Sequence, residues 1–212
     1  AVAPAIGAAT RQTAAPSPTS VLFIGRLEQL KGCDEFVTAF LSAWRQEPGG
    51  LHAVVVGGGS RYQALRRRGV EEGAEEAITF TGELPHAEVL TYYRPATIYV
   101  SLNRMCNLTN TSIEALTAGC CCVFPAAQPD IGADLETDRL FPPETVLRIS
   151  RVEDTEALAD VLLRLHRNPE ERLARARGTL ALARDIVPSW ERRMAREVSL
   201  LEALAAAAGA AR

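Results

Sequence analysis

The sequence predicts an α/β fold: a doubly wound, Rossmann-like parallel sheet of about six strands, flanked by helices and followed by a long C-terminal helix. Short apolar runs alternate with segments of helical periodicity along most of the 212 residues, which is the order of repeated βαβ units. The runs are continuously apolar, as in strands that are buried on both faces of a parallel sheet. Helices are therefore expected on both faces of one sheet.

The predicted strands are short, mostly apolar and bounded by glycine, proline or polar turn residues. The first, SVLFIG, ends at Gly25, and the second, LHAVVVGGG, is rich in β-branched valine and ends in glycines. The strands are expected at 20–25, 51–59, 77–82, 96–102, 120–125 and 144–150.

The predicted helices are marked by apolar residues at intervals of three or four and by signals at their ends. Ser60 is the expected N-cap of one helix, Pro85 stands at the start of another, and Gly119 is the expected C′ stop of a third. The helices are expected at 33–46, from 60 onwards, and at 85–94, 110–119, 153–166, 169–185 and 188–208.

Composition divides the chain into three parts. Residues 1–17 are rich in Ala, Pro, Ser and Thr, which predicts a linker or an extended segment. Residues 18–186 carry the strand and helix signals and form the predicted Rossmann-like domain. Residues 187–212 form the predicted C-terminal helix.

Charge and composition argue against two classes of partner. The formal net charge of −3 leaves no basic surplus for phosphate backbones, so nucleic acid is not an expected partner. The basic stretch 61–69 is interpreted as the solvated face of a helix. No apolar run approaches the ~20 residues that span a bilayer, so no integral membrane segment is expected.

The five cysteines and three histidines show no metal-ligand spacing. Cys120, Cys121 and Cys122 are consecutive in an apolar strand, which is a poor geometry for mutual disulfides or for a metal. We expect buried, reduced thiols in a reducing, cytoplasmic compartment. No metal and no cofactor are predicted.

The segments that follow the strands are the candidate sites, because a doubly wound fold binds its ligand at the carboxyl ends of its strands. The first of them, GRLEQLKG, places Gly25, Arg26 and Lys31 just before a helix. Two cations and a helix N-terminus at one place favour a diphosphate. The residues alone do not decide between this diphosphate site and a second interpretation, in which Arg26 and Lys31 are ordinary surface cations and Arg26 pairs with Glu28.

The second segment, VVVGGGS, contains Gly57 and Gly59. It is not a P-loop, because no Gly-Lys-Ser/Thr follows, and Tyr62 stands where a dinucleotide fingerprint requires glycine. Two interpretations stay open: the backbone approaches a ligand there, or the glycines serve a tight strand-to-helix turn.

A further segment runs into the helix expected at 110–119, whose first amides are free. Glu114 is expected in the first turn, where the helix dipole stabilises a carboxylate by ~0.3–1 kcal/mol. A sharper interpretation is that Glu114 accepts hydrogen bonds from the vicinal hydroxyls of a ribose. The polar residues that can cap this helix or bind a ligand are Asn107, Thr109, Asn110, Thr111 and Ser112.

A series of motifs extends over residues 20–207: VLFIGRLEQLKG, VVVGGGS, ITFTGELP, YVSL, NLTNTSIEALTAG and PSWERR. In this order and spacing they resemble the C-terminal domain of GT-B retaining glycosyltransferases, in particular the group 1, glycogen synthase-like transferases. No single motif is decisive. The G-R-L…K-G loop and the E-A-L-x-A-G helix are fairly specific as a pair.

The resemblance implies a nucleotide-sugar donor site without a metal. By it, Arg26 and Lys31 hold the diphosphate and stabilise it as leaving group, which makes them the candidate catalytic residues. Glu114 binds the ribose hydroxyls. The remaining donor-binding residues that it implies are Gly25, Gly57, Gly59, Glu83, Leu84, Asn107, Thr109, Asn110 and Thr111.

The sugar-facing positions depart from the family pattern. Cys106 stands where many members carry a glutamate, and CNLTN at 106–110 is closer to a Ser-Asn-Leu-Gly-Asn run found in a subgroup. Thr109 stands where both versions carry glycine, so its Cβ is expected to crowd the sugar. This departure motivates a second hypothesis, a degenerate GT-B domain that serves as a non-catalytic interaction module.

The resemblance also implies a partner. GT-B enzymes hold the acceptor in a second, N-terminal domain. For this chain we expect such a domain or a partner subunit to hold it, so the isolated domain is expected to be inactive. The terminal helix would cross to that domain, and without it the apolar stripe of residues 190–204 favours a homodimer. A third hypothesis, an NAD-dependent oxidoreductase or nucleotide-sugar epimerase, lacks its G-x-G-x-x-G turn after the first strand.

Overall fold

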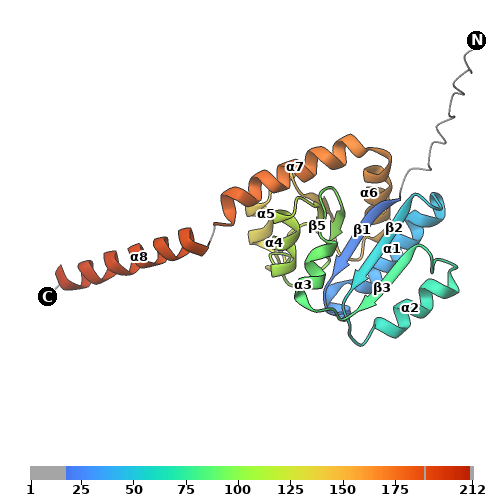
Figure 1. Cartoon of the computed structure of the whole chain (residues 1–212), viewed down its shortest axis with the longest axis horizontal. Helices are drawn as coiled ribbons and strands as arrows, with labels where there is room; N and C mark the ends of the chain where they lie inside the picture. Colours follow the sequence, from blue (N-terminus) through green and yellow to red (C-terminus); the bar gives the residue numbers. More distant parts are fainter. Residues whose placement is uncertain (1–17, 189, 211–212) are drawn as a thin grey trace, which may run out of the picture.

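The protein contains one six-stranded parallel sheet with the order β3-β2-β1-β4-β5-β6. The computed structural model describes residues 18–188 and 190–210 (Figure 1). The order reverses between β1 and β4, which makes this a doubly wound fold and confirms the predicted class. The strands are β1 Thr19–Ile24, β2 Leu51–Val56, β3 Ile78–Gly82, β4 Ile98–Val100, β5 Cys121–Pro125 and β6 Leu147–Ile149.

Helices cover both faces of the sheet (Figure 1). Residues of α1, α2 and α6 share one buried cluster, whereas residues of α4 and α7 share the other. The helices are α1 Cys33–Gln46, α2 Tyr62–Glu71, α3 His86–Val89, α4 Asn110–Thr117, α5 Leu135–Leu140, α6 Thr155–Arg167, α7 Pro169–Ile186 and α8 Trp190–Ala210, with short 3-10 turns at Gln29–Lys31 and Leu90–Tyr92.

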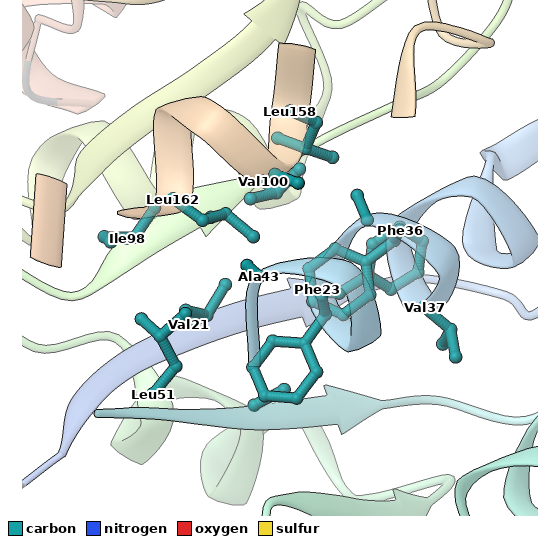
Figure 2. Close-up of a cluster of buried hydrophobic side chains, with 14 of the residues drawn as sticks. Val21, Phe23, Phe36, Val37, Ala43, Leu51, Ile98, Val100, Leu158 and Leu162 are labelled. Atoms are coloured by element: carbon teal, nitrogen blue, oxygen red, sulfur yellow. The ribbon is translucent and has the colours of Figure 1, made fainter. Parts of the chain in front are cut away.

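The larger core lies between the sheet and the pair α1 and α6. Figure 2 shows Phe23 of β1 facing Phe36 of α1, and the centroids of these two rings are 5.1 Å apart. Alternate residues of β1 face opposite sides, so Phe23 enters this core and Leu22 enters the other. Burial on both sides explains why the strands are continuously apolar.

The consecutive cysteines follow the same alternation. Cys121 faces the α1 side, whereas Cys120 and Cys122 face the α4 side, and all three are fully buried free thiols. Burial raises the pKa of Cys120 and of Cys121 to about 12. The prediction of buried thiols is confirmed for all three residues, and the predicted place in a strand is confirmed for Cys121 and Cys122, because Cys120 directly precedes β5.

Several local predictions are wrong. Ser60 does not cap α2: Arg61 is the N-cap and makes no side-chain cap hydrogen bond. The short helix expected at 85–94 is present after Pro85, but it is shorter than predicted: one α-turn, His86–Val89, continues as a 3-10 turn, Leu90–Tyr92. A helix that was not expected, α5, lies between β5 and β6. Its sequence, LETDRL, has too few apolar residues to show a helical period.

The helix α8 projects from the body (Figure 1). Its exposed apolar side chains include Trp190, Val198, Leu201 and Leu204, in agreement with the stripe seen in the sequence. The predicted linker at 1–17 and the last two residues of the predicted terminal helix, 211–212, lie outside the described residues. The division into domains and the homodimer stay predictions.

Within the described residues, no helix is long and apolar enough to cross a bilayer. Over the same residues, no group of three or more Cys, His, Asp or Glu side chains is arranged to hold a metal ion.

Candidate functional site

A cleft of about 250 Å³ opens at the reversal point of the sheet, where the carboxyl ends of β1 and β4 separate. This is the position at which doubly wound folds bind their ligands. Three segments meet around the cleft: the loop after β1, the loop after β4 and the start of α4. Its lining residues are Phe23, Ile24, Gly25, Arg26, Lys31, Ser101, Leu102, Asn103, Thr109, Asn110 and Thr111.

Gly32 brings the first of these segments to the cleft. Its φ is +69°, and a Cβ on it would lie 2.5 Å from Leu102 Cβ and 2.6 Å from Leu102 O. The start of α1 therefore rests directly on Leu102, in the loop that follows β4. This contact places Lys31 and the β4 loop on the same cleft.

Arg26 and Lys31 form no ion pair with a carboxylate anywhere in the described part of the chain. The alternative pairing of Arg26 with Glu28 is absent. Instead, Ser60 N and Ser60 Oγ donate to the two Glu28 carboxylate oxygens at 2.9 and 2.5 Å. These bonds from Ser60 hold the pKa of Glu28 below its usual value, and the charge of Arg26 adds a smaller effect.

The glycines after β2 allow two loops to pack closely. A Cβ on Gly57 would lie 2.0 Å from Gly25 O, and one on Gly59 would lie 2.6 Å from Leu27 O. Leu27 N donates to Gly58 O at 2.7 Å, which closes the contact. Close packing of the β1 and β2 loops therefore accounts for both glycines. Gly59 lines neither this cleft nor its neighbour, whereas Gly57 lines the neighbouring hollow.

A second hollow, of about 300 Å³, adjoins the cleft through Ile24, Gly25 and Arg26, which line both. It contains Gly57 and the two residues expected to contact a base, Glu83 and Leu84. The structure thus brings the predicted diphosphate and base positions side by side, with Arg26 between them.

Thr109 is the N-cap of α4, and its Oγ1 accepts a hydrogen bond from Ser112 N at 3.3 Å. Its backbone is extended, with φ −109°, so this position does not require glycine here. Asn110 and Thr111 are the first helical residues, and both line the cleft. Their amides have no acceptor within the helix and are available to an anion.

Asn107 is fully buried and hydrogen-bonded within the protein. Its Oδ1 accepts from Ser101 Oγ and Asn103 N, and its Nδ2 donates to Asn103 O and Asp134 Oδ2, at 2.7 to 3.1 Å. Asp134 has φ +60° and also accepts from Asn107 N. Asn107 therefore shapes the β4 loop from inside and does not line the cleft.

Glu114 lies outside the first turn of α4, which contains no acidic residue, so the predicted dipole role is wrong. Its carboxylate accepts from His86 Nε2 at 2.8 Å and from Tyr93 Oη at 3.0 Å. Burial above all, with smaller effects of Tyr99 and the Glu114 carboxylate, raises the pKa of Tyr93. Glu114 lines neither hollow, but its bond to His86 places it beside the loop that carries Leu84.

Sequence reasoning missed the residues that hold the site together: His86, Tyr93 and Asp134. The signal for two of them was position, because His86 and Asp134 lie in the segments that follow β3 and β5. Their partners lie 27 or 28 residues away along the chain, and no local pattern reports such contacts.

Lys31 is the only lysine in the sequence, whereas every other permanently cationic side chain is an arginine. An ammonium group is a compact charge with three donors, and a guanidinium is a planar fork, so the two are not interchangeable. The cleft thus combines one cation of each kind.

Solved structures with similar folds include proteins whose names identify them as glycosyltransferases. The C-terminal domain of the group 1 family protein LpcC from Francisella tularensis matches with a TM-score of 0.69 and 20% identity, over 80% of this chain and 86% of that one. The pneumococcal O-GlcNAc transferase GtfA, in complex with UDP and GlcNAc, matches at 0.68 and 20%, over 89% and 36%. Anabaena HepE, in complex with UDP, matches at 0.66 and 16%, over 86% and 49%.

Two curated relatives are D-inositol 3-phosphate glycosyltransferases. The one from Nocardia farcinica is 31% identical over 124 residues, and the one from Acidothermus cellulolyticus is 35% identical over 88 residues. These alignments cover 56% and 38% of this chain but only 27% and 20% of the relatives, so the chain spans a minor part of their length. The model of the family "Glycosyl transferases group 1" matches residues 18–168. The chain therefore belongs to the group 1 glycosyl transferases.

Proposed function

We propose that this chain is the domain of a retaining glycosyltransferase that binds the nucleotide-sugar donor, while the acceptor is held by another domain or a partner subunit. The observation that carries the proposal is the set of groups around the cleft. Two cations without carboxylate partners in the described residues, Arg26 and Lys31, and the free amides of α4 surround one space at the reversal point. This is a site for an anion with several oxygens.

The proposed reaction makes use of those charges. The bond between the anomeric carbon and the diphosphate oxygen breaks, the acceptor oxygen bonds to that carbon, and the departing diphosphate takes up the proton of the acceptor hydroxyl. Negative charge grows on the departing diphosphate. Cations that are already in place therefore stabilise the transition state more than the bound donor. Neither a metal nor a protein nucleophile is part of the proposal.

The nucleoside is assigned to the second hollow and its surroundings. Glu83 and Leu84 line that hollow, and Glu114 lies next to the same loop through His86. Two of the similar structures hold UDP, which makes UDP the first nucleotide to test.

The proposal is tested by isothermal titration with UDP. We expect saturable binding and an approximately tenfold or greater loss of affinity in Arg26→Ala, because a hydrogen bond to a charged group contributes about 1.5–3 kcal/mol. Arg66→Ala, which removes an exposed arginine of α2 that lines neither hollow, is the matched control. No binding of UDP, GDP or ADP at millimolar concentration would refute the proposal.

A second function, a non-catalytic interaction module, is favoured by the sugar-facing residues. Cys106 bonds only weakly, to Leu108 O at 3.9 Å, and offers no carboxylate to a sugar. Thr109 adds a side chain at the cleft. The test is donor turnover by the full-length protein. The double variant Cys106→Glu with Thr109→Gly restores the residues of the family pattern. If neither this variant nor the unaltered protein turns over the donor, the interaction module is the better description.

A further inference from the structure

The carboxylate of Glu114 is held by two side-chain donors from outside its own helix. His86, the first residue of α3, lies with Nε2 2.8 Å from Oε1, and Tyr93 donates from Oη to Oε2 at 3.0 Å. Each oxygen thus has one donor. The bond from His86 requires a proton on Nε2, which is present in one neutral tautomer and in the charged ring.

The two donors differ in their surroundings. Tyr93 is 8% exposed and packs against Tyr99, with ring centroids 6.1 Å apart. The His86 side chain is 70% exposed and that of Glu114 is 24% exposed. The tyrosine is thus held by packing, the histidine lies at the surface, and the Glu114 side chain remains partly open to solvent.

The number of acceptor sites on this carboxylate matches a specific ligand group. An ionised carboxylate offers about four lone-pair sites, two on each oxygen. His86 and Tyr93 use one site on each oxygen, so each oxygen keeps one. A vicinal diol, such as that of a ribose, presents two hydroxyl donors that could occupy these two sites together.

We propose that His86 and Tyr93 are positioning residues, which hold the Glu114 carboxylate for the vicinal diol of a ribose and so make the site selective for ribonucleotides. This inference rests on the proposed function. A glutamate side chain that is free in solution loses rotamer freedom when a ligand fixes it, and two donors that fix it beforehand remove that loss. His86 also follows Glu83 and Leu84 in one loop, so base and ribose contacts are coupled.

Titration calorimetry with two ligands, UDP and 2′,3′-dideoxyuridine diphosphate, tests the inference. The unaltered chain should bind UDP at least about tenfold more tightly, and Glu114→Gln should remove most of this preference. His86→Ala and Tyr93→Phe should weaken UDP binding about three- to tenfold, the size of one hydrogen bond, and leave the dideoxy ligand unaffected. His86→Gln, which keeps an N–H donor, should restore part of the affinity.

Matched controls separate positioning from folding. His52→Ala removes a histidine that contacts Thr79 on the sheet, and Tyr92→Phe removes the neighbouring hydroxyl; neither should change the preference. Equal losses for both ligands would show a structural role and overturn the inference, as would unchanged or tighter UDP binding in His86→Ala. If the unaltered chain binds UDP without preferring it to the dideoxy ligand, only this inference fails. If it binds neither of them, nor GDP or ADP, the proposed function fails as well.

Discussion

Arg26 and Lys31, on the β1 side of the cleft, have no carboxylate partner within the described residues, whereas Glu114 on α4 is held by two side-chain donors. The difference follows from the chemistry proposed for each side. A diphosphate brings its own charge and many acceptor oxygens, so its cations must stay available. A diol is neutral and small, so it binds more tightly to an acceptor that is already fixed in place. The two cations therefore stay without carboxylate partners within the described residues, whereas the Glu114 carboxylate is fixed before the ligand binds.

The largest effect is expected from a substitution at Gly57, whose backbone packs against Gly25 next to Arg26. In Gly57→Ala the new Cβ would meet Gly25 O at 2.0 Å, and φ is +134°. We expect the free energy of unfolding to fall by at least about 2 kcal/mol, because backbone strain of this kind alone costs about 1–3 kcal/mol. Urea denaturation measures it.

Gly73→Ala is the control for this prediction. Gly73 also has a left-handed φ, +67°, but a Cβ there meets nothing within 4 Å. We expect a loss of about 1 kcal/mol from the strain alone. Equal losses in the two variants would mean that the contact between the β1 and β2 loops does not matter.

A smaller effect is expected from the single lysine. Lys31→Ala should weaken UDP binding by about ten- to a hundredfold, corresponding to roughly 1.5–3 kcal/mol. Lys31→Arg should restore only part of the affinity, because the planar fork does not replace a point charge in a site that already holds Arg26. Titration calorimetry measures both. Full affinity in Lys31→Ala would assign the diphosphate contact to other groups.

The smallest effect is expected in the reactivity of the five thiols. Cys106 is partly exposed, whereas Cys33, Cys120, Cys121 and Cys122 are buried. We expect one rapid reaction per folded chain with a disulfide reagent at pH 8, and the other four thiols should react only after unfolding. Rapid reaction of further thiols would show that the loops around the core open easily.

The pH dependence has a definite sign. Burial raises the pKa of Cys33, Cys120 and Cys121 to about 12, whereas an unfolded thiol ionises near pH ~8.5. The folded chain therefore keeps protons that the unfolded chain releases. The thiol contribution to stability is complete below about pH 8.5 and declines as the pH rises towards 12. Urea titrations between pH 7 and 10 should show this decline.

The strands were predictable because their pattern is local: continuous apolar runs result from burial on both faces. The helix α5 was not, because it depends on Asp134, whose left-handed backbone is held by bonds to Asn107 in another loop. Ser60 illustrates the same limit. Its hydroxyl satisfies a distant partner, Glu28, instead of the end of its own helix.

The site was predictable to a similar extent. The positions of Arg26, Lys31 and Asn110 follow from the rule that ligands meet strand ends, and all three line one cleft. The helix starts at Asn110, as predicted, and Glu114 is its fifth residue, beyond the first turn. The surroundings of Glu114 were not predictable, because they depend on side chains from another part of the chain. Its contact with His86 joins segments 28 residues apart.

The sole lysine provides the most direct test of the central claim, that the cation side of the cleft holds a diphosphate. Reductive methylation with ¹³C-formaldehyde keeps the charge of Lys31 and gives one side-chain signal besides that of the chain's terminal amine. We predict that this signal shifts saturably with UDP and with pyrophosphate, and does not shift with uridine. A Lys31 signal that is unchanged at millimolar UDP would contradict the account.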